Sequence, residues 1–94
     1  MNLVNGKPSS SISIFDRGFL YGDSVFETIL VLDKKPKNID LHLKRLKLGC
    51  NKLKINNLDH KLLSKYIKKA LSDINNCILC INVTRGTAIK RGYN

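Results

Sequence analysis

The fold of this chain is decided by the stretch Val25-Phe26-Glu27-Thr28-Ile29-Leu30-Val31-Leu32, an apolar run rich in β-branched residues. Tyr21-Gly22-Asp23 precedes it and Lys34-Lys35-Pro36-Lys37 follows it. Glycine and aspartate are typical of turns, and proline lacks the backbone donor that a sheet requires. We therefore predict that residues 24–33 form the central strand of a sheet.

Shorter β-prone segments lie on both sides of this stretch. Leu3-Val4 and residues 11–15 are separated by Asn5-Gly6-Lys7-Pro8, and an Asn-Gly pair is a strong signal for a hairpin. We expect this hairpin to open the chain and to join the sheet. Residues 77–83 form a further apolar, β-branched run and complete a mostly antiparallel sheet.

Between these strands the hydrophobic period changes to that of a helix. One stripe has alternating spacings of four and three and consists of Ile39, Leu43, Leu46, Cys50 and Leu53. It predicts a helix over residues 39–54, capped by Asn38 or Asp40. A second stripe predicts a helix over residues 58–74 with Asn57 as N-cap; its members are Leu63, Ile67, Ala70 and Ile74, widened by Leu62, Tyr66 and Leu71.

These elements predict a two-layer α+β domain, in which the two helices cover one face of the sheet. The 94 residues are enough for about one domain, which excludes a multidomain enzyme and assigns residues 1–94 to a single domain. Such a small domain buries about two-thirds of its unfolded surface. We therefore expect exposed apolar surface that requires a partner.

The charge of the chain is strongly positive. Seventeen Lys and Arg residues against seven Asp and Glu give a formal net charge of +10, which favours an anionic partner such as a nucleic acid, an anionic membrane, a phosphorylated cofactor or an acidic second domain. The chain shows neither the aromatic stacking platform of RNA-binding sheets nor a Cys/His finger. A basic nucleic-acid-binding module is the alternative function of another class.

The three cysteines, Cys50, Cys77 and Cys80, are odd in number and indicate free thiols in a reducing compartment. Cys77 and Cys80 have the C-x-x-C spacing of metal and redox sites, but three positions along a strand place them on opposite faces. We expect no metal site. The sequence has no signal-peptide pattern and no apolar run approaching about 18 residues, so we expect a cytoplasmic protein outside the membrane.

Two groups of residues suggest chemistry. His42, Arg45 and Gly49 form a second stripe beside the apolar one, where the planar guanidinium suits a phosphate and the glycine leaves room for a ligand or a backbone. The alternative is a solvated helix cation beside a structural histidine. Residues 16–28 combine charges, glycines and aromatics just before the central strand, and these aromatics line either a binding surface or the core.

The order of residues within these groups resembles a known family. The motifs are Asp16-Arg-Gly-Phe-Leu-Tyr-Gly-Asp-Ser-Val-Phe-Glu-Thr28, His42-Leu-Lys-Arg-Leu46 and Thr84-Arg-Gly followed by Arg91-Gly-Tyr93. They resemble the amino-terminal domain of fold-type IV pyridoxal-phosphate enzymes, a family that contains aminodeoxychorismate lyases, D-amino-acid aminotransferases and branched-chain aminotransferases. The opening residues and Arg91-Gly-Tyr93 look most like the lyases, which eliminate pyruvate from 4-amino-4-deoxychorismate to give 4-aminobenzoate for folate synthesis; Glu27 looks more like the aminotransferases.

The resemblance implies pyridoxal 5′-phosphate as cofactor and Arg45 as the residue that binds its phosphate, with His42 beside it in a structural role. It also implies a set of residues near the substrate: Tyr21, Phe26 and Glu27 as walls of the active site, and Arg91 and Tyr93 on the side of the substrate carboxylate. The substrate would be a small molecule.

The resemblance also implies what these 94 residues lack. The family's covalently bound lysine and the acidic partner of the pyridine nitrogen lie on a carboxy-terminal domain, and no lysine here occupies a matching position. We therefore expect no catalytic residue in this chain. It would be a truncated or split product that is inactive alone, or a fragment without a function of its own, and family members lead us to expect a homodimer.

Overall fold

The computed structural model describes residues 1–56 and 58–87. Its main sheet contains β3 (Ser24–Leu32), β4 (Lys35–Pro36) and β5 (Cys77–Thr84) in the antiparallel order β4-β3-β5. β3 and β5 are paired along nearly their whole length, from Ser24 opposite Thr84 to Val31 opposite Cys77. The predicted central and final strands are confirmed.

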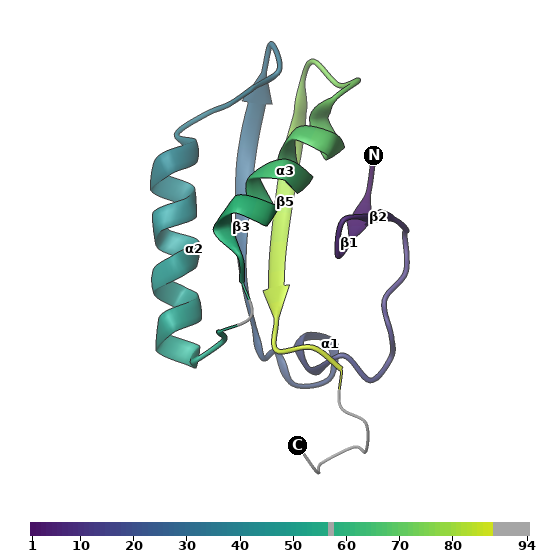
Figure 1. The fold of residues 1–94 in the computed structure, drawn as a ribbon, viewed down its shortest axis with the longest axis vertical. Coiled ribbons are helices and arrows are strands. Elements are labelled where there is room, and N and C mark those ends of the chain that lie inside the picture. Colours follow the sequence, from purple (N-terminus) through teal and green to yellow (C-terminus); the bar gives the residue numbers. More distant parts are fainter. Residues whose placement is uncertain (57, 88–94) are drawn as a thin grey trace.

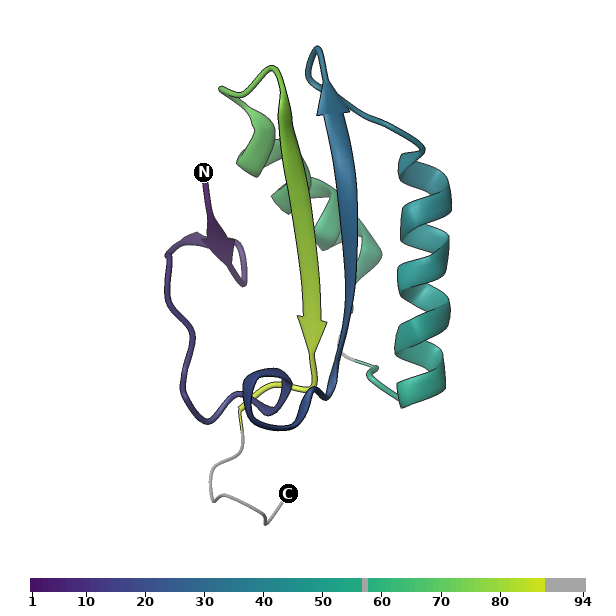
Figure 2. The same cartoon turned by 180° about the vertical axis from the view of Figure 1, so that it is seen from behind.

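In the described ranges, two long helices and one short helix accompany this sheet. They are α1 (Arg17–Tyr21), α2 (Ile39–Leu53) and α3 (His60–Leu71). Figure 1 shows α2 alongside β3 and α3 crossing over the β3–β5 pair; in Figure 2, seen from behind, both strands lie in front of α3. The fold is α+β, as predicted.

The alternation of side chains along β3 and β5 separates the two faces of the sheet. The odd-numbered positions face the helices, and the core consists of Ile29, Val31, Leu46, Leu63, Ile67, Leu71 and Ile81. The even-numbered positions Phe26, Leu30, Leu32 and Ile78 are exposed. This outer face of β3 and β5, which we call the open face, carries no charged residue although a quarter of the chain is charged.

The predicted opening hairpin is wrong in its extent and in its place. It consists only of β1 (Leu3–Val4) and β2 (Lys7–Pro8), which form a separate two-stranded sheet, while residues 11–15 are not a strand. Asn5 and Gly6 both have positive φ, so the chain reverses within two residues and the return strand begins at once. The hairpin docks on α3, where the Lys69 amine donates to the Gly6 carbonyl at 2.9 Å.

The region between the hairpin and β3 contains the short helix α1, which the sequence analysis did not predict. The Asp16 carboxylate accepts hydrogen bonds from the backbone N–H groups of Gly18 and Phe19 and so caps this helix. Gly22 ends it in the left-handed conformation at φ 68°.

The ends of the longer helices differ by a few residues from the prediction. Asn38 precedes α2 but makes no capping hydrogen bond through its side chain. Asp59 caps α3 by accepting from the N–H groups of Lys61 and Leu62, and Asn57, the predicted cap, lies outside the described residues. α3 ends at Leu71, so Ile74 lies beyond it, and Leu53 at the end of α2 is exposed.

Gly49 sets the distance between α2 and β3. A Cβ atom at this position would lie 2.7 Å from Cγ1 of Val25, and a β-branched side chain has little freedom to move away. We expect Gly49→Ala to lower the free energy of unfolding by about 1–3 kcal/mol, the usual cost of overpacking. Urea denaturation measures the change, and Lys47→Ala on the exposed side of α2 is the control.

The same substitution distinguishes packing from helix propensity. In a Val25→Ala background the clash is absent, so Gly49→Ala should stabilise the protein by about 1 kcal/mol, the difference in helix propensity between the two residues. Equal destabilisation in both backgrounds would contradict the role of the Val25 contact.

Candidate functional site

The candidate site consists of Glu27 on β3 and two side chains of α2, His42 and Arg45. Glu27 shares the covered face of β3 with Ile29, and its side chain is 6% exposed. His42 and Arg45 are three positions apart on α2 and therefore lie on one side of that helix. We call these three residues the Glu27 cluster.

The contacts within the Glu27 cluster are short. Nδ1 of His42 lies 2.7 Å from Oε1 of Glu27. Arg45 donates from Nε to Oε2 at 3.0 Å and from Nη2 to Oε1 at 2.8 Å, so one edge of the guanidinium spans both carboxylate oxygens. This two-point geometry fixes the plane of the guanidinium.

Glu27 and Arg45 stabilise each other's ionised forms. The hydrogen bonds from Arg45, followed by the one with His42, hold the pKa of Glu27 below its ordinary value, against the opposing effect of desolvation. The hydrogen bonding and charge of Glu27 raise the pKa of Arg45 in turn. Glu27 is therefore ionised near neutral pH and Arg45 stays charged.

The orientation of Arg45 leaves part of its guanidinium available. A guanidinium has five N–H donors, of which Glu27 takes one on Nε and one on Nη2. Within residues 1–56 and 58–87, Nη1 makes no hydrogen bond, and the side chain is 71% exposed. Three donors thus face outward on a fixed plane, which suits a phosphate or a carboxylate.

Among the other predicted site residues, the structure describes Phe26 and Tyr21. Phe26 precedes Glu27 and points to the open face, where it is 66% exposed. Tyr21 ends α1, with the guanidinium of Arg17 4.9 Å from its ring centre. Arg91 and Tyr93 lie outside the described residues. The structure thus joins Glu27 to Arg45 and His42, while its sequence neighbour Phe26 points to the opposite face of the sheet.

The contacts of Gly49 and Arg45 decide between the alternatives that the sequence left open for these two residues. The space beside Gly49 is filled by Val25, not by a ligand. Arg45 is more than a solvated helix cation, because Glu27 holds it at two points. A groove of about 400 Å³ between α2 and α3 is lined mainly by apolar side chains, and no member of the Glu27 cluster lines it.

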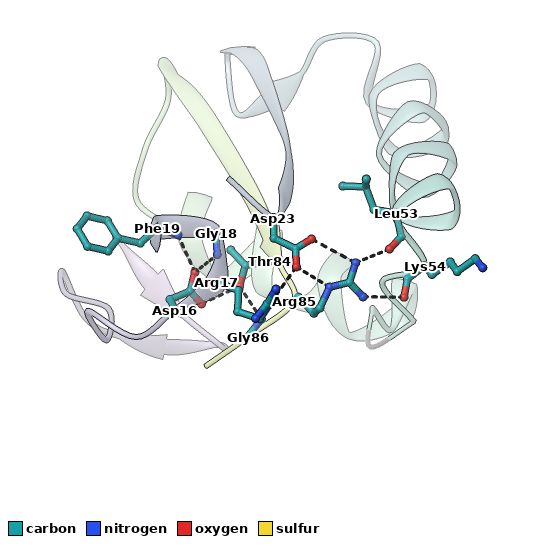
Figure 3. A network of polar contacts seen from close by, with 10 residues as sticks. All are labelled: Asp16, Arg17, Gly18, Phe19, Asp23, Leu53, Lys54, Thr84, Arg85 and Gly86. Atoms are coloured by element: carbon teal, nitrogen blue, oxygen red, sulfur yellow. Dashed lines mark hydrogen bonds and ion pairs between the residues drawn. The ribbon is translucent and has the colours of Figure 1, made fainter. Parts of the chain in front are cut away.

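A second polar network, which the sequence did not reveal, surrounds Arg85 just after β5 (Figure 3). Arg85 pairs with Asp23 and also donates to the carbonyl groups of Leu53 and Lys54 at the end of α2. Arg17 donates to the same Asp23 carboxylate at 3.2 Å. Its members stand in two of the quoted motifs, Arg17 and Asp23 in residues 16–28 and Arg85 in Thr84-Arg85-Gly86, but the sequence did not show that they pair.

The cysteines and the helices give no sign of other chemistry. Cys77 and Cys80 lie on opposite faces of β5, as predicted, and burial raises the pKa of the Cys50 thiol. In the part of the chain that the structure describes, no three His, Cys, Asp or Glu side chains gather as ligands for a metal ion. No helix among those residues has the length and apolar character needed to cross a membrane.

Similar proteins share both the sequence and the fold. The sequence model of the family described as Amino-transferase class IV matches residues 24–92. The aminodeoxychorismate lyase of Bacillus subtilis strain 168 is 34% identical over 101 residues, which cover 96% of this chain and 34% of that protein.

Two solved structures extend this similarity to three dimensions. The 4-amino-4-deoxychorismate lyase of Pseudomonas aeruginosa superimposes with a TM-score of 0.85 at 36% identity, over 95% of this chain and 32% of that one. A protein described as a putative 4-amino-4-deoxychorismate lyase from Legionella pneumophila has a TM-score of 0.75 at 29% identity, over 96% and 34%.

The present chain therefore spans about a third of the length of these relatives. The family match covers β3, α2, α3 and β5, which together hold the core and the Glu27 cluster. By sequence and by fold, the chain belongs to the class IV aminotransferase family.

Proposed function

We propose that this chain is the phosphate-binding domain of a pyridoxal-phosphate-dependent 4-amino-4-deoxychorismate lyase. The observation that carries the proposal is Arg45, whose guanidinium is fixed by Glu27 and keeps three N–H donors turned outward. A phosphate is bound best by a planar cation with paired donors, because two parallel hydrogen bonds form at once. The Glu27 carboxylate preserves this orientation without occupying the outer edge of the guanidinium.

The described residues fit one end of the cofactor. Arg45 would bind the phosphate, while Glu27 holds the guanidinium from the buried side and His42 contacts the Glu27 carboxylate. When bound, pyridoxal phosphate supplies an electron sink for cleavage next to an amino group, and the protein supplies orientation and electrostatics. In this proposal, binding the phosphate is the contribution of α2 and β3.

The choice of a lyase rests on the relatives, whose names specify aminodeoxychorismate lyase. The proposed reaction is the elimination of pyruvate from 4-amino-4-deoxychorismate, a step of folate biosynthesis. Tyr21, Phe26, Arg91 and Tyr93 remain predicted contacts of the substrate.

We expect a lysine-bearing domain or a second copy of the chain to dock on the open face, where Phe26 and Ile78 are exposed. We place the enzyme in the cytoplasm.

The phosphate contact can be tested with pyridoxine 5′-phosphate, which lacks the aldehyde and so does not react with the many lysines of the chain. We expect saturable binding with a Kd on the order of millimolar, since one charge-assisted contact must offset the entropy of association. Arg45→Ala should abolish it in a titration followed by NMR.

Two matched controls accompany this titration. Lys44→Ala and Lys47→Ala remove a charge from neighbouring exposed positions of α2 and should leave the affinity nearly unchanged. Pyridoxine without the phosphate should not bind. Equal losses in all three variants would mean that net charge alone attracts the ligand, and the proposed site would be wrong.

The Glu27 cluster should also make the folding stability of the protein depend on pH in the acid range. Because the pKa of Glu27 is lowered in the folded protein, its contribution to stability is present above its ordinary value of 4.5 and is lost as the pH falls through the folded pKa. The stability gap between the wild type and Glu27→Gln should therefore be constant near neutral pH and shrink below 4.5.

Urea denaturation across a pH series measures this gap. Asp23 also has a lowered pKa, so the difference between the two proteins, rather than the curve of either, reports on Glu27. Asp73→Asn, at an exposed carboxylate after α3, is the control substitution. A gap of the same size at acid and neutral pH would contradict the proposed ionisation.

We expect that the 94 residues release no pyruvate from 4-amino-4-deoxychorismate by themselves, because the family resemblance places the covalently bound lysine elsewhere. The measurement combines pyruvate release with borohydride reduction of the protein in the presence of pyridoxal phosphate. A reduced adduct at one defined lysine, together with pyruvate release, would show that the catalytic centre lies within this chain.

A further inference from the structure

Arg85 joins three parts of the fold that lie far apart in the sequence. It follows the last residue of β5, its partner Asp23 directly precedes β3, and its two carbonyl partners, Leu53 and Lys54, end α2. Figure 3 shows its guanidinium between the Asp23 carboxylate and these carbonyl oxygens. Nε and Nη2 face the carboxylate at 2.5 and 3.2 Å, and Nη1 donates to the Lys54 carbonyl at 3.2 Å.

The contact with α2 is favourable for an electrostatic reason. The last carbonyl groups of a helix have no intrahelical partners and carry the negative end of the helix dipole. A cation that also pairs with Asp23 neutralises this end and links it to the start of β3. Arg85 is therefore bound to the helix and to the strand at the same time.

This link acts on the same two elements as the Glu27 cluster. Glu27 lies four residues after Asp23 on β3, and Arg45 lies nine residues before Lys54 on α2. At a rise of 1.5 Å per residue, the two attachments on α2 are about 13 Å apart. Two separated attachments fix both the rotation of the helix and its position along the strand.

The second attachment matters for binding because Arg45 keeps its hydrogen bonds to Glu27 only if α2 stays in its position along the sheet. A shift of α2 by one residue would move Arg45 by about 1.5 Å, enough to break hydrogen bonds of 2.8–3.0 Å to Glu27. We propose that Arg85 is a positioning residue for anion binding by Arg45, because it locks the end of α2 to the sheet. This inference rests on the proposed function of Arg45.

The test observes Arg45 directly, by NMR of its Nε–H group, which donates to Glu27. In Arg85→Ala we expect faster solvent exchange of this group and a Kd for pyridoxine 5′-phosphate raised roughly threefold to tenfold, as for other coupled residues. Arg85→Lys should show a smaller increase in exchange rate and in Kd than Arg85→Ala, because the lysine ammonium reaches either Asp23 or the helix end but not both.

Arg17→Ala is the matched control. Arg17 also pairs with Asp23 but makes no side-chain hydrogen bond to α2 among the described residues. If Arg85 only contributes to general stability, both variants should lower the unfolding temperature and leave the Arg45 signal unchanged well below that temperature. That result would overturn the inference.

The two proposals fail in different ways. If the wild type does not bind pyridoxine 5′-phosphate, the proposed function is wrong, and the positioning role falls with it even where the Arg45 signal responds to Arg85→Ala. If the wild type binds and Arg85→Ala leaves exchange and affinity unchanged, only the positioning role is wrong. Should Arg85→Ala not fold, Arg85→Lys and Asp23→Asn provide the same two readouts.

Discussion

The structure depends on the strict alternation of side chains along β3. Because successive residues point to opposite faces, Ile29 and Val31 enter the core, and Glu27 lies in line with them beneath α2. A carboxylate on the covered face of a sheet requires a compensating charge, which Arg45 provides from α2, while His42 contacts the same carboxylate. The same period that builds the core thus places the candidate site.

Glu27 and Arg45 combine two roles that are often separate. Their contact attaches α2 to the sheet, and it also orients a cation whose outer edge stays in solvent. A lone exposed arginine would lose considerable conformational entropy when it binds an anion. The carboxylate has already imposed that order in the folded protein, so the proposed anion site is preorganised.

The positive charge of the chain is absent from one surface of the molecule, the open face of the sheet. A net charge of +10 is compatible with many anionic partners, yet the open face of the sheet carries no charge at all. Phe26, Leu30 and Ile78 lie exposed there, in a molecule whose relatives are three times as long. Apolar surface of this kind favours contact with protein rather than with a polyanion.

The sequence alone determined the class of fold, the central strand, both long helices and the family, because periodicity and motif order are local properties that survive in any context. The resemblance to the family also singled out Arg45 as the predicted phosphate-binding residue. Only the tertiary structure decided that Glu27 belongs with Arg45 and not with Phe26, that the hairpin leaves the main sheet, and that Arg85 joins Asp23 to the end of α2. These are contacts between residues up to 62 positions apart, and no local pattern encodes which distant partner a side chain meets.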